Sequence, residues 1–420
     1  MLNDPGIYLK TPLAPPLAAG ASVVDPTFGT TIYRLTDPSV LPGQAHLADR
    51  STVRWFNADG TRLIVRQTGA GLPGWLVFAI GDAPVRVTKI AEFSGTWASG
   101  LQWDPVDPDR VYRTVGRTII AYRFSTGQNT LLINFTPVMP GTGYASLTHQ
   151  LDQQIGRYHA NCAASGAICT GQDCYDYVGV FDAQVGQIVA TLHVPTAIPT
   201  ITGKGLHGID FDNSGRYVML TYPGGPNILW EWATGRLDNF GYVGQRFGGH
   251  HAFGDGIVLN PVNGSDLLWR DLALPSSQTP VLTFSAPKKN GKADWYEDKH
   301  FTRVRPDGSF IMGSYVTKAN RAYADQDWRP LMEEIVELTL AGNLVSSYRR
   351  LCHHRNMDTG GWPPHPAANA SPDGRWVAWQ SNWDRTQRAE IYLIRLGAPG
   401  TDTTPPTPPL SPLIQSIQWT

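Results

Sequence analysis

The sequence predicts an all-β fold, a seven-bladed β-propeller of four-stranded blades, and three observations carry this prediction. Residues that form turns are abundant, with 43 Gly and 33 Pro among 420 residues. Aromatic residues reach 10 %, and no long stretch has sustained helical periodicity. Hairpin-rich segments recur every 40 to 55 residues or so, which is roughly the period of propeller blades. A division into two domains is the alternative at this length, but no break in composition before residue 398 supports it.

The last repeat contains the clearest hairpin. A Ser371-Pro372-Asp373-Gly374 turn separates the stretch that begins at Trp362 from the strand Trp376 to Trp379. Asp-Gly between two apolar or alternating runs predicts a hairpin, because Gly supplies the positive φ that the turn needs. The turn at Asn57 to Gly60 has the same character, and we interpret both turns as structural.

Seven such segments follow one another along the chain. They span about 50–90, 95–135, 146–194, 205–243, 248–284, 294–351 and 352–396. The alternating strand Thr30 to Thr36 has no hairpin of its own, so we expect it to join the last blade and close the ring. The predicted organisation is an extended N-terminal leader (1–22), the propeller (23–398) and a Pro/Thr-rich linker or tail (399–420). This tail resembles linkers that precede fibronectin-type or carbohydrate-binding modules in bacterial secreted proteins.

The charge balance argues against two classes of partner. The net charge is −1, and no polybasic run is present, so nucleic acid and anionic membrane surfaces are not expected partners. No apolar run reaches the roughly 18 residues that a membrane span needs. We expect a monomer that is secreted or held at the cell surface, in the extracellular space.

Three of the four cysteines, Cys162, Cys169 and Cys174, lie within one short stretch. In an exported protein this spacing favours a disulfide that staples a loop. A zinc site is the alternative, although it would need closer pairs such as C-x2-C. Cys352 is either free or pairs with the cysteine that remains.

Histidines recur at similar positions in four consecutive segments. His207 and His300 lie eight residues before the turn glycines Gly215 and Gly308, and His365 lies nine before Gly374. His251 takes the corresponding place in the fifth segment. In a propeller the first strand of each blade lines the central channel, so these imidazoles converge on one divalent-metal site or catalytic cluster. The alternative is that they satisfy hydrogen bonds within the blades.

Other side chains suit recognition of an acidic sugar. Trp295 and Trp362 provide aromatic faces that stack on sugar rings, and Arg355 suits a carboxylate. Ordinary packing is the alternative for the tryptophans. Candidate catalytic residues are His250 and Tyr296 for proton transfer and Arg303 for the carboxylate. His353 and His354 are candidates to extend the site, whereas we interpret His46 and His193 as structural.

Several phrases resemble a known family. His365-Pro366 followed by Ser371 to Trp379 resembles the TolB-type propeller repeat and the oligogalacturonate lyases, in which histidines at the channel mouth of a seven-bladed propeller bind manganese. The phrases from Trp103 to Asp109 and from Gly249 to His251 are similar to that family too. The family's His-Pro-His-Pro run is altered here, since Pro363 replaces its first histidine. Propeller lyases that act on ulvan use His, Tyr and Arg and fit the composition as well.

The resemblance implies a secreted polysaccharide lyase that cleaves a uronate-containing glycan by metal-assisted β-elimination at the channel mouth. The metal ligands would be His207, His251, His300 and His365, with Mn, Ca or Zn as the cofactor. The alternative is a non-catalytic propeller that binds glycan or protein at the cell surface, because fold alone does not decide function.

Overall fold

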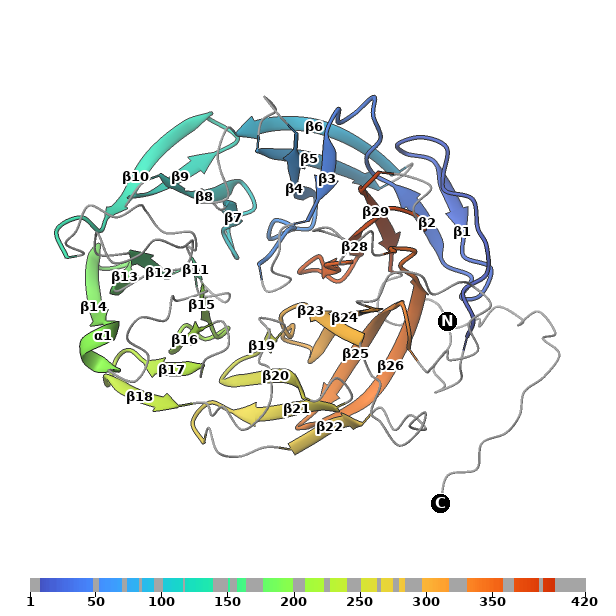
Figure 1. The fold of residues 1–420 in the computed structure, drawn as a ribbon. Coiled ribbons are helices and arrows are strands. Elements are labelled where there is room, and N and C mark those ends of the chain that lie inside the picture. Colours follow the sequence, from blue (N-terminus) through green and yellow to red (C-terminus); the bar gives the residue numbers. More distant parts are fainter. Residues whose placement is uncertain are drawn as a thin grey trace, which may run out of the picture.

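The computed structural model describes most of the chain. The described residues are 8–47, 53–69, 74–82, 85–93, 101–115, 118–138, 150–151, 157–163, 177–198, 208–222, 227–239, 251–262, 266–274, 279–283, 297–316, 331–357, 366–384 and 388–396. Their strands form seven antiparallel sheets arranged as a ring of blades around a central axis (Figure 1). The prediction of a seven-bladed propeller is confirmed.

Each blade is a meander that runs outward from the axis. Blade one contains β3 (Gln44–His46), β4 (Arg62–Thr68), β5 (Trp75–Asp82) and β6 (Val85–Phe93). Blade two contains β7 (Leu101–Trp103), β8 (Arg110–Val115), β9 (Thr118–Arg123) and β10 (Gln128–Asn134). Blade three contains β11 (Gln150–Leu151), β12 (Tyr158–Ala163), β13 (Tyr177–Asp182) and β14 (Gln187–His193), and is followed by the one-turn helix α1 (Val194–Ala197). Blade four contains β15 (Gly208–Phe211), β16 (Tyr217–Thr221), β17 (Ile228–Glu231) and β18 (Arg236–Asn239).

The remaining three blades complete the ring. Blade five contains β19 (Ala252–Phe253), β20 (Ile257–Val262), β21 (Asp266–Asp271) and β22 (Thr279–Thr283). Blade six contains β23 (Glu297–Phe301), β24 (Ser309–Val316), β25 (Glu334–Ala341) and β26 (Leu344–His353). Blade seven contains β27 (Asn369–Ala370), β28 (Trp376–Ser381) and β29 (Glu390–Arg395), to which the N-terminal strands β2 (Thr31–Arg34) and β1 (Ser22–Val24) are added.

The N-terminal strands close the ring as the sequence predicts. β2 pairs with β29 in the register Ile32 to Ile394, so blade seven combines the two ends of the propeller. β1 then pairs with β2 as a fifth strand, which no pattern in the sequence indicated. Blade one also begins earlier than the expected boundary near residue 50, because β3 already pairs with β4 at Gln44 to His46.

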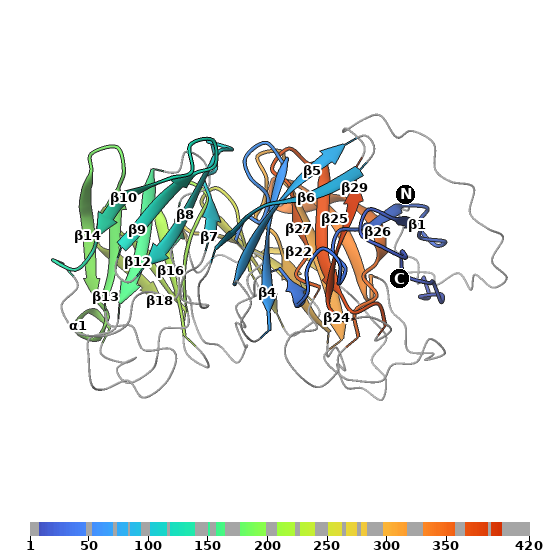
Figure 2. The ribbon, with the colours of Figure 1, turned by 90° about the horizontal axis from the view of Figure 1, so that it is seen from above.

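The core lies between neighbouring blades. Middle strands such as β16 and β28 are buried at every residue, because both of their faces are covered by other blades. Outer strands such as β14 alternate between exposed and covered residues. A large cluster packs Trp376 of blade seven and Val77 of blade one with Trp103 of blade two. Seen from the side, the blades stand next to one another around the axis (Figure 2).

Tight turns connect the first two strands of several blades. Gly308 has φ +80° and Gly374 has φ +72°, as the Asp-Gly pattern predicts. A Cβ atom on Gly308 would lie 2.7 Å from the carbonyl oxygen of Leu340. The left-handed backbone and this close approach both require glycine there, so the turn is a structural element.

Candidate functional site

The channel has two different ends, because all inner strands run in the same direction through the ring. We call the end where inner strands such as β15 and β23 begin the start face, and the end where they finish the turn face. Four predicted site residues, His207, His250, His251 and His365, precede the inner strand of their blade in sequence. Of these, only His251 lies among the described residues. From the order of the sequence alone, the predicted site is expected at the start face.

The turn face carries a cavity of about 830 Å³ in the mouth of the channel. The second residue of the inner turn in each of five blades lines this cavity. These residues are Pro105, Asn213, Asp255, Pro306 and Pro372. Arg54, Arg303 and Arg305 add positive charge to the wall, and Asp255 and Asp307 add negative charge. The volume lies in the usual range for small-molecule sites, which is roughly 300–1,000 Å³.

Arg303, a predicted catalytic residue, lies at this turn face. Its Nη1 donates to the carbonyl oxygen of Phe211 at 2.6 Å and to Asn213 Oδ1 at 3.2 Å. Its guanidinium also lies 5.6 Å from the centre of the Phe253 ring. Arg303 thus joins blade six to blade four across blade five, whose inner strand has only two residues. Its catalytic role stays a prediction.

Of the four predicted metal ligands, His251 and His300 lie among the described residues, and both are buried. His251 Nε2 lies 3.5 Å from Asp210 Oδ2 of blade four, and its ring meets that of Phe253 edge-on at 4.7 Å. His300 lies on β23 opposite Gly313. The Asp210 carboxylate, which was not among the candidates from the sequence, can orient the His251 ring. In the sequence, Asp210 stands between the apolar residues Ile209 and Phe211, and this polar residue within an apolar strand was the signal that could have identified it.

The two histidines do not share one level of the channel. The turn of blade five begins at Gly254, three residues after His251, whereas that of blade six begins at Arg305, five residues after His300. Both offsets are odd, so the side chains point to the same side of their blades. They differ by two residues, or about 7 Å along a strand. Counting residues back from the turn therefore does not give the level of the histidine in blade five.

Of the other predicted site residues, only Arg355 is described by the structure. His207, His250, Trp295, Tyr296, Trp362 and His365 lie outside the described residues. Arg355 is described and fully buried, with Nη1 donating to the carbonyl oxygen of Thr11 at 2.8 Å. Its Nη1 also lies 3.6 Å from Asp384 Oδ2. Its substrate-binding role stays a prediction.

His353 and His354, the candidates to extend the site, are buried too. Burial lowers the pKa of His353 well below its ordinary value, although its hydrogen bond to the carbonyl oxygen of Tyr8 acts the other way. His354 Nδ1 accepts a hydrogen bond from the backbone N–H of Asn356 at 2.9 Å. Both rings are built into the junction of blades six and seven.

A metal or disulfide is not assembled in the part of the chain that the structure describes. In that part, no three His, Cys, Asp or Glu side chains gather as a metal site. Cys352 is free and buried. Cys162 lies on β12, but its side chain and the residues Cys169 and Cys174 fall outside the description, so their pairing stays a prediction.

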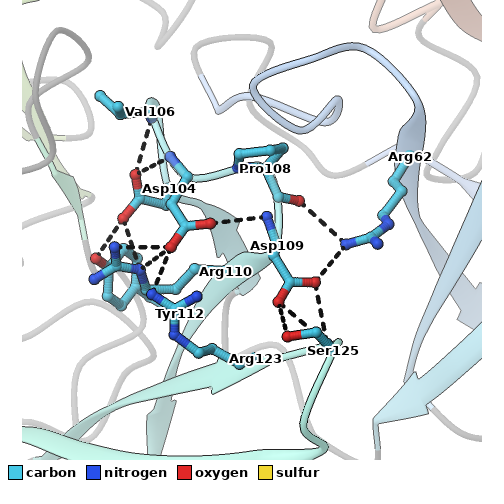
Figure 3. Close-up of polar contacts among 10 residues, drawn as sticks. Arg62, Asp104, Val106, Pro108, Asp109, Arg110, Tyr112, Arg123 and Ser125 are labelled. Atoms are coloured by element: carbon cyan, nitrogen blue, oxygen red, sulfur yellow. Dashed lines mark hydrogen bonds and ion pairs between the residues drawn. The ribbon is translucent and has the colours of Figure 1, made fainter.

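The phrase from Trp103 to Asp109 forms a polar network where blades one and two meet (Figure 3). Asp104 Oδ1 accepts the backbone N–H groups of Val106 and Asp107 at 2.9 and 2.8 Å. Its Oδ2 accepts the Tyr112 hydroxyl at 2.7 Å, and burial together with this carboxylate raises the pKa of Tyr112. The Asp107 carboxylate accepts from Arg110 and Arg123, and that of Asp109 accepts from Ser125 and from Arg62 of blade one. All three carboxylates of the phrase thus have protein partners, which indicates a structural role.

No helix among the described residues is long and apolar enough to cross a membrane.

Comparison with solved structures supports the fold over nearly the whole chain. An oligogalacturonate lyase in complex with manganese superposes with a TM-score of 0.61 at 13 % identity, covering 91 % of this chain and 99 % of that one. An oligogalacturonate lyase from Vibrio parahaemolyticus gives a TM-score of 0.60 at 11 % identity, covering 90 % and 96 %. No family model and no curated protein sequence matches the chain. The chain is thus similar in fold to oligogalacturonate lyases, and the distant resemblance expected from the sequence is confirmed.

Proposed function

We propose that this propeller is a secreted polysaccharide lyase that cleaves a uronate-containing glycan by β-elimination at the start face of the channel. The observation that carries the proposal is the match to oligogalacturonate lyases along almost the full length of both chains. The same end of the channel is where the sequence gathers histidines ahead of the inner strands. The paired His251 and Asp210 add a buried imidazole beside a carboxylate.

β-Elimination sets three chemical requirements. A positive charge next to the uronate carboxylate acidifies the C5 proton, a base removes that proton, and the sugar linked through O4 leaves. His250 and Tyr296 are the residues proposed for proton transfer. Trp295 and Trp362 are proposed to stack on the sugar rings, with Arg355 as the arginine proposed for the carboxylate. Arg303 lies at the turn face, so it is not part of the site proposed at the start face.

A divalent cation is part of the proposal, because one neighbour is a manganese complex. The described residues supply two of its four proposed ligands, His251 and His300, at levels two residues apart. These two do not by themselves form a site, so no step is derived through the metal. Elemental analysis of the purified protein tests it, and we expect a His300→Ala variant to lose the metal that the native chain carries.

Activity is tested directly by incubating the protein with oligogalacturonate, pectin, ulvan and alginate, with and without added Mn²⁺ or Ca²⁺. The unsaturated uronate product is read by its ultraviolet absorbance. We expect product with one of the four glycans and a loss of at least tenfold in rate for His251→Ala. Absence of product with every glycan and metal would overturn the lyase proposal.

A non-catalytic module that binds glycan or protein is the second candidate. The cavity of about 830 Å³ on the turn face favours it, since this mouth lies at the opposite end from the proposed reaction. Glycan binding without cleavage, weakened by Arg54→Gln but not by His251→Ala, would support this candidate over the first.

A further inference from the structure

The layer of side chains between blades four and five changes from apolar to polar toward the start face. Near the turns it is filled by apolar side chains of both blades, namely Tyr217, Met219, Leu229, Phe253, Val258 and Leu272. Nearer to the start face it contains buried polar side chains instead, namely Asp210, Asn227, His251 and Asn260. One of these, His251, belongs to the candidate site.

The strand registers place these polar side chains on the faces that the two blades turn toward each other. Asp210 lies opposite Met219 in the ladder of β15 and β16, so the two share one face. The ladder of β19 and β20, extended by one residue, places His251 opposite Asn260. Opposite side chains of an antiparallel pair lie on the same face, with Cβ atoms about 4.5–5.5 Å apart. The contact of the His251 ring with that of Phe253, a member of the apolar layer, agrees with this placement.

Three of the buried side chains carry polar atoms that have no hydrogen-bond partner within the described part of the chain. These atoms are His251 Nε2, Asn227 Oδ1 and both amide atoms of Asn260. The three residues are 3 %, 2 % and 0 % exposed. A buried polar group without a partner costs about 1–3 kcal/mol, so an apolar side chain of similar size would be more stable than Asn260. The packing of the blades therefore gives no reason for an amide at this position.

The Asp210 carboxylate decides which ring nitrogen of His251 carries the proton. His251 Nε2 lies 3.5 Å from Asp210 Oδ2, and an ionised carboxylate can only accept, so Nε2 is the nitrogen that is protonated in the neutral ring. The distance is longer than a direct hydrogen bond, and one bound water bridges such a gap. Two other charged residues on these faces lie nearer to the turns, since Asp212 belongs to the turn of blade four and Arg270 lies opposite Val258.

We propose that Asp210 and Asn260 are positioning residues for His251. Asp210 holds the ring in the tautomer with a protonated Nε2, and the Asn260 amide holds the bound water that joins Nε2 to the carboxylate. Nδ1 then keeps the lone pair that a cation or a proton transfer requires. The inference rests on the proposed function, which assigns His251 to the site at the start face. Neither Asp210 nor Asn260 needs to touch the substrate.

The first test determines the tautomer directly. The full-length protein is labelled with ¹⁵N in its histidine rings and measured by NMR at a pH where the His251 ring is neutral, and a His251→Gln variant identifies the His251 signals by their loss. We expect a protonated Nε2 and a bare Nδ1 in the native protein. In Asp210→Asn the new amide can donate to Nε2, so we expect the tautomer with a protonated Nδ1 to appear. A native ring protonated on Nδ1, or a ring that Asp210→Asn leaves unchanged, overturns the inference.

The variant Asn260→Leu separates positioning from a purely structural role. Leucine removes the amide without a partner, so we expect a thermal midpoint at or above the native value, together with a His251 ring that no longer has a single tautomer. Asn57→Leu is the matched control. Asn57 is equally buried, but its Oδ1 accepts the backbone N–H of Arg62 at 2.8 Å and its Nδ2 donates to the carbonyl oxygen of Pro108 at 3.0 Å. We expect the control to lose stability and to keep the native tautomer. An unchanged tautomer in Asn260→Leu overturns the role of Asn260.

A kinetic readout connects the tautomer to function. For the glycan that the native protein cleaves, we expect Asp210→Asn and Asn260→Leu to lower kcat at least tenfold while KM stays near the native value. Asn57→Leu should keep the native kcat at a temperature where it is fully folded. A changed tautomer with native kinetics overturns the inference. If the native protein cleaves no glycan, the proposed lyase function fails, while the ring spectra still decide whether Asp210 and Asn260 position His251.

Discussion

His46 shows how a single buried side chain links the stability of this propeller to pH. It lies on β3, and its Nε2 is 3.0 Å from Thr68 Oγ1. Burial and the nearby Arg66 lower the pKa of His46 to about 4. The ring is neutral in the folded protein at neutral pH, which fits the structural role expected from the sequence.

We predict that the unfolding free energy decreases as the pH falls from the ordinary histidine pKa of about 6.5 toward the folded value. In that range the unfolded chain binds a proton that folded His46 does not. The contribution of His46 reaches about 3 kcal/mol at the lower end. Denaturant titrations at several pH values check this, and His46→Gln should have a shallower slope. An identical slope in the variant would contradict the assignment.

The buried pair Arg350–Glu334 gives a second prediction at this scale. Both side chains are fully buried, with Arg350 Nε donating to Glu334 Oε2 at 2.7 Å and a second contact between Arg350 Nη2 and Glu334 Oε1. Glu334→Gln leaves a buried guanidinium without its counter-charge, so we expect a loss of about 3–5 kcal/mol in unfolding free energy. Glu92→Gln on the exposed pair with Lys89 should cost less than about 1 kcal/mol. Equal losses would contradict this view.

At the scale of the element, the tight turns within a blade depend on glycine for two separable reasons. Gly308 combines a positive φ with the close approach of the Leu340 carbonyl oxygen. Gly127 has φ +67° with nothing within 4 Å of its would-be Cβ. Substitution of Gly127 therefore reports backbone strain alone, whereas substitution of Gly308 reports backbone strain together with a steric clash.

We predict that Gly127→Ala costs about 1–2 kcal/mol from the left-handed backbone alone. Gly308→Ala should cost more, because its methyl group also displaces the carbonyl oxygen of Leu340, which lies on β25 of the same blade. Urea titrations of both variants measure the difference. A smaller loss at Gly308 than at Gly127 would show that the turn of blade six relaxes freely.

At the scale of the whole molecule, the ring is closed by chain segments that are far apart in sequence. β2 completes blade seven, β1 adds a fifth strand, and an N-terminal arm, residues 8–13, anchors Lys10 against Asp384, 374 residues away. Deleting residues 1–35 would remove all three and leave β29 as an unpaired edge, which invites pairing with another chain.

We predict that this deletion lowers the unfolding midpoint strongly and produces concentration-dependent association. Sedimentation velocity and thermal unfolding measure the two effects. Deleting residues 399–420 is the control, since it retains every described strand. A shortened protein that stays monomeric with a native midpoint would refute the closing role of the N-terminal segment.

The sequence by itself determined the repeat, the number of blades and the closing role of the strand near residues 30–36. These features follow from local signals, namely Gly-containing turns and apolar runs at a regular period. The histidines ahead of the inner strands were visible for the same reason. The sequence did not show the levels of these histidines along the channel, because the turn of blade five is shorter than those of blades four and six.

Only the tertiary structure decided which polar residues are built into the fold. Arg303 bridges blades six and four, Arg355 is buried beneath the arm, and His251 lies beside Asp210 of another blade. Lys10 looks like an ordinary residue of a Pro- and Ala-rich leader, yet it is an anchor of blades six and seven. The physical reason is that burial and charge pairing depend on contacts between segments that ring closure brings together, and no local pattern in the sequence records them.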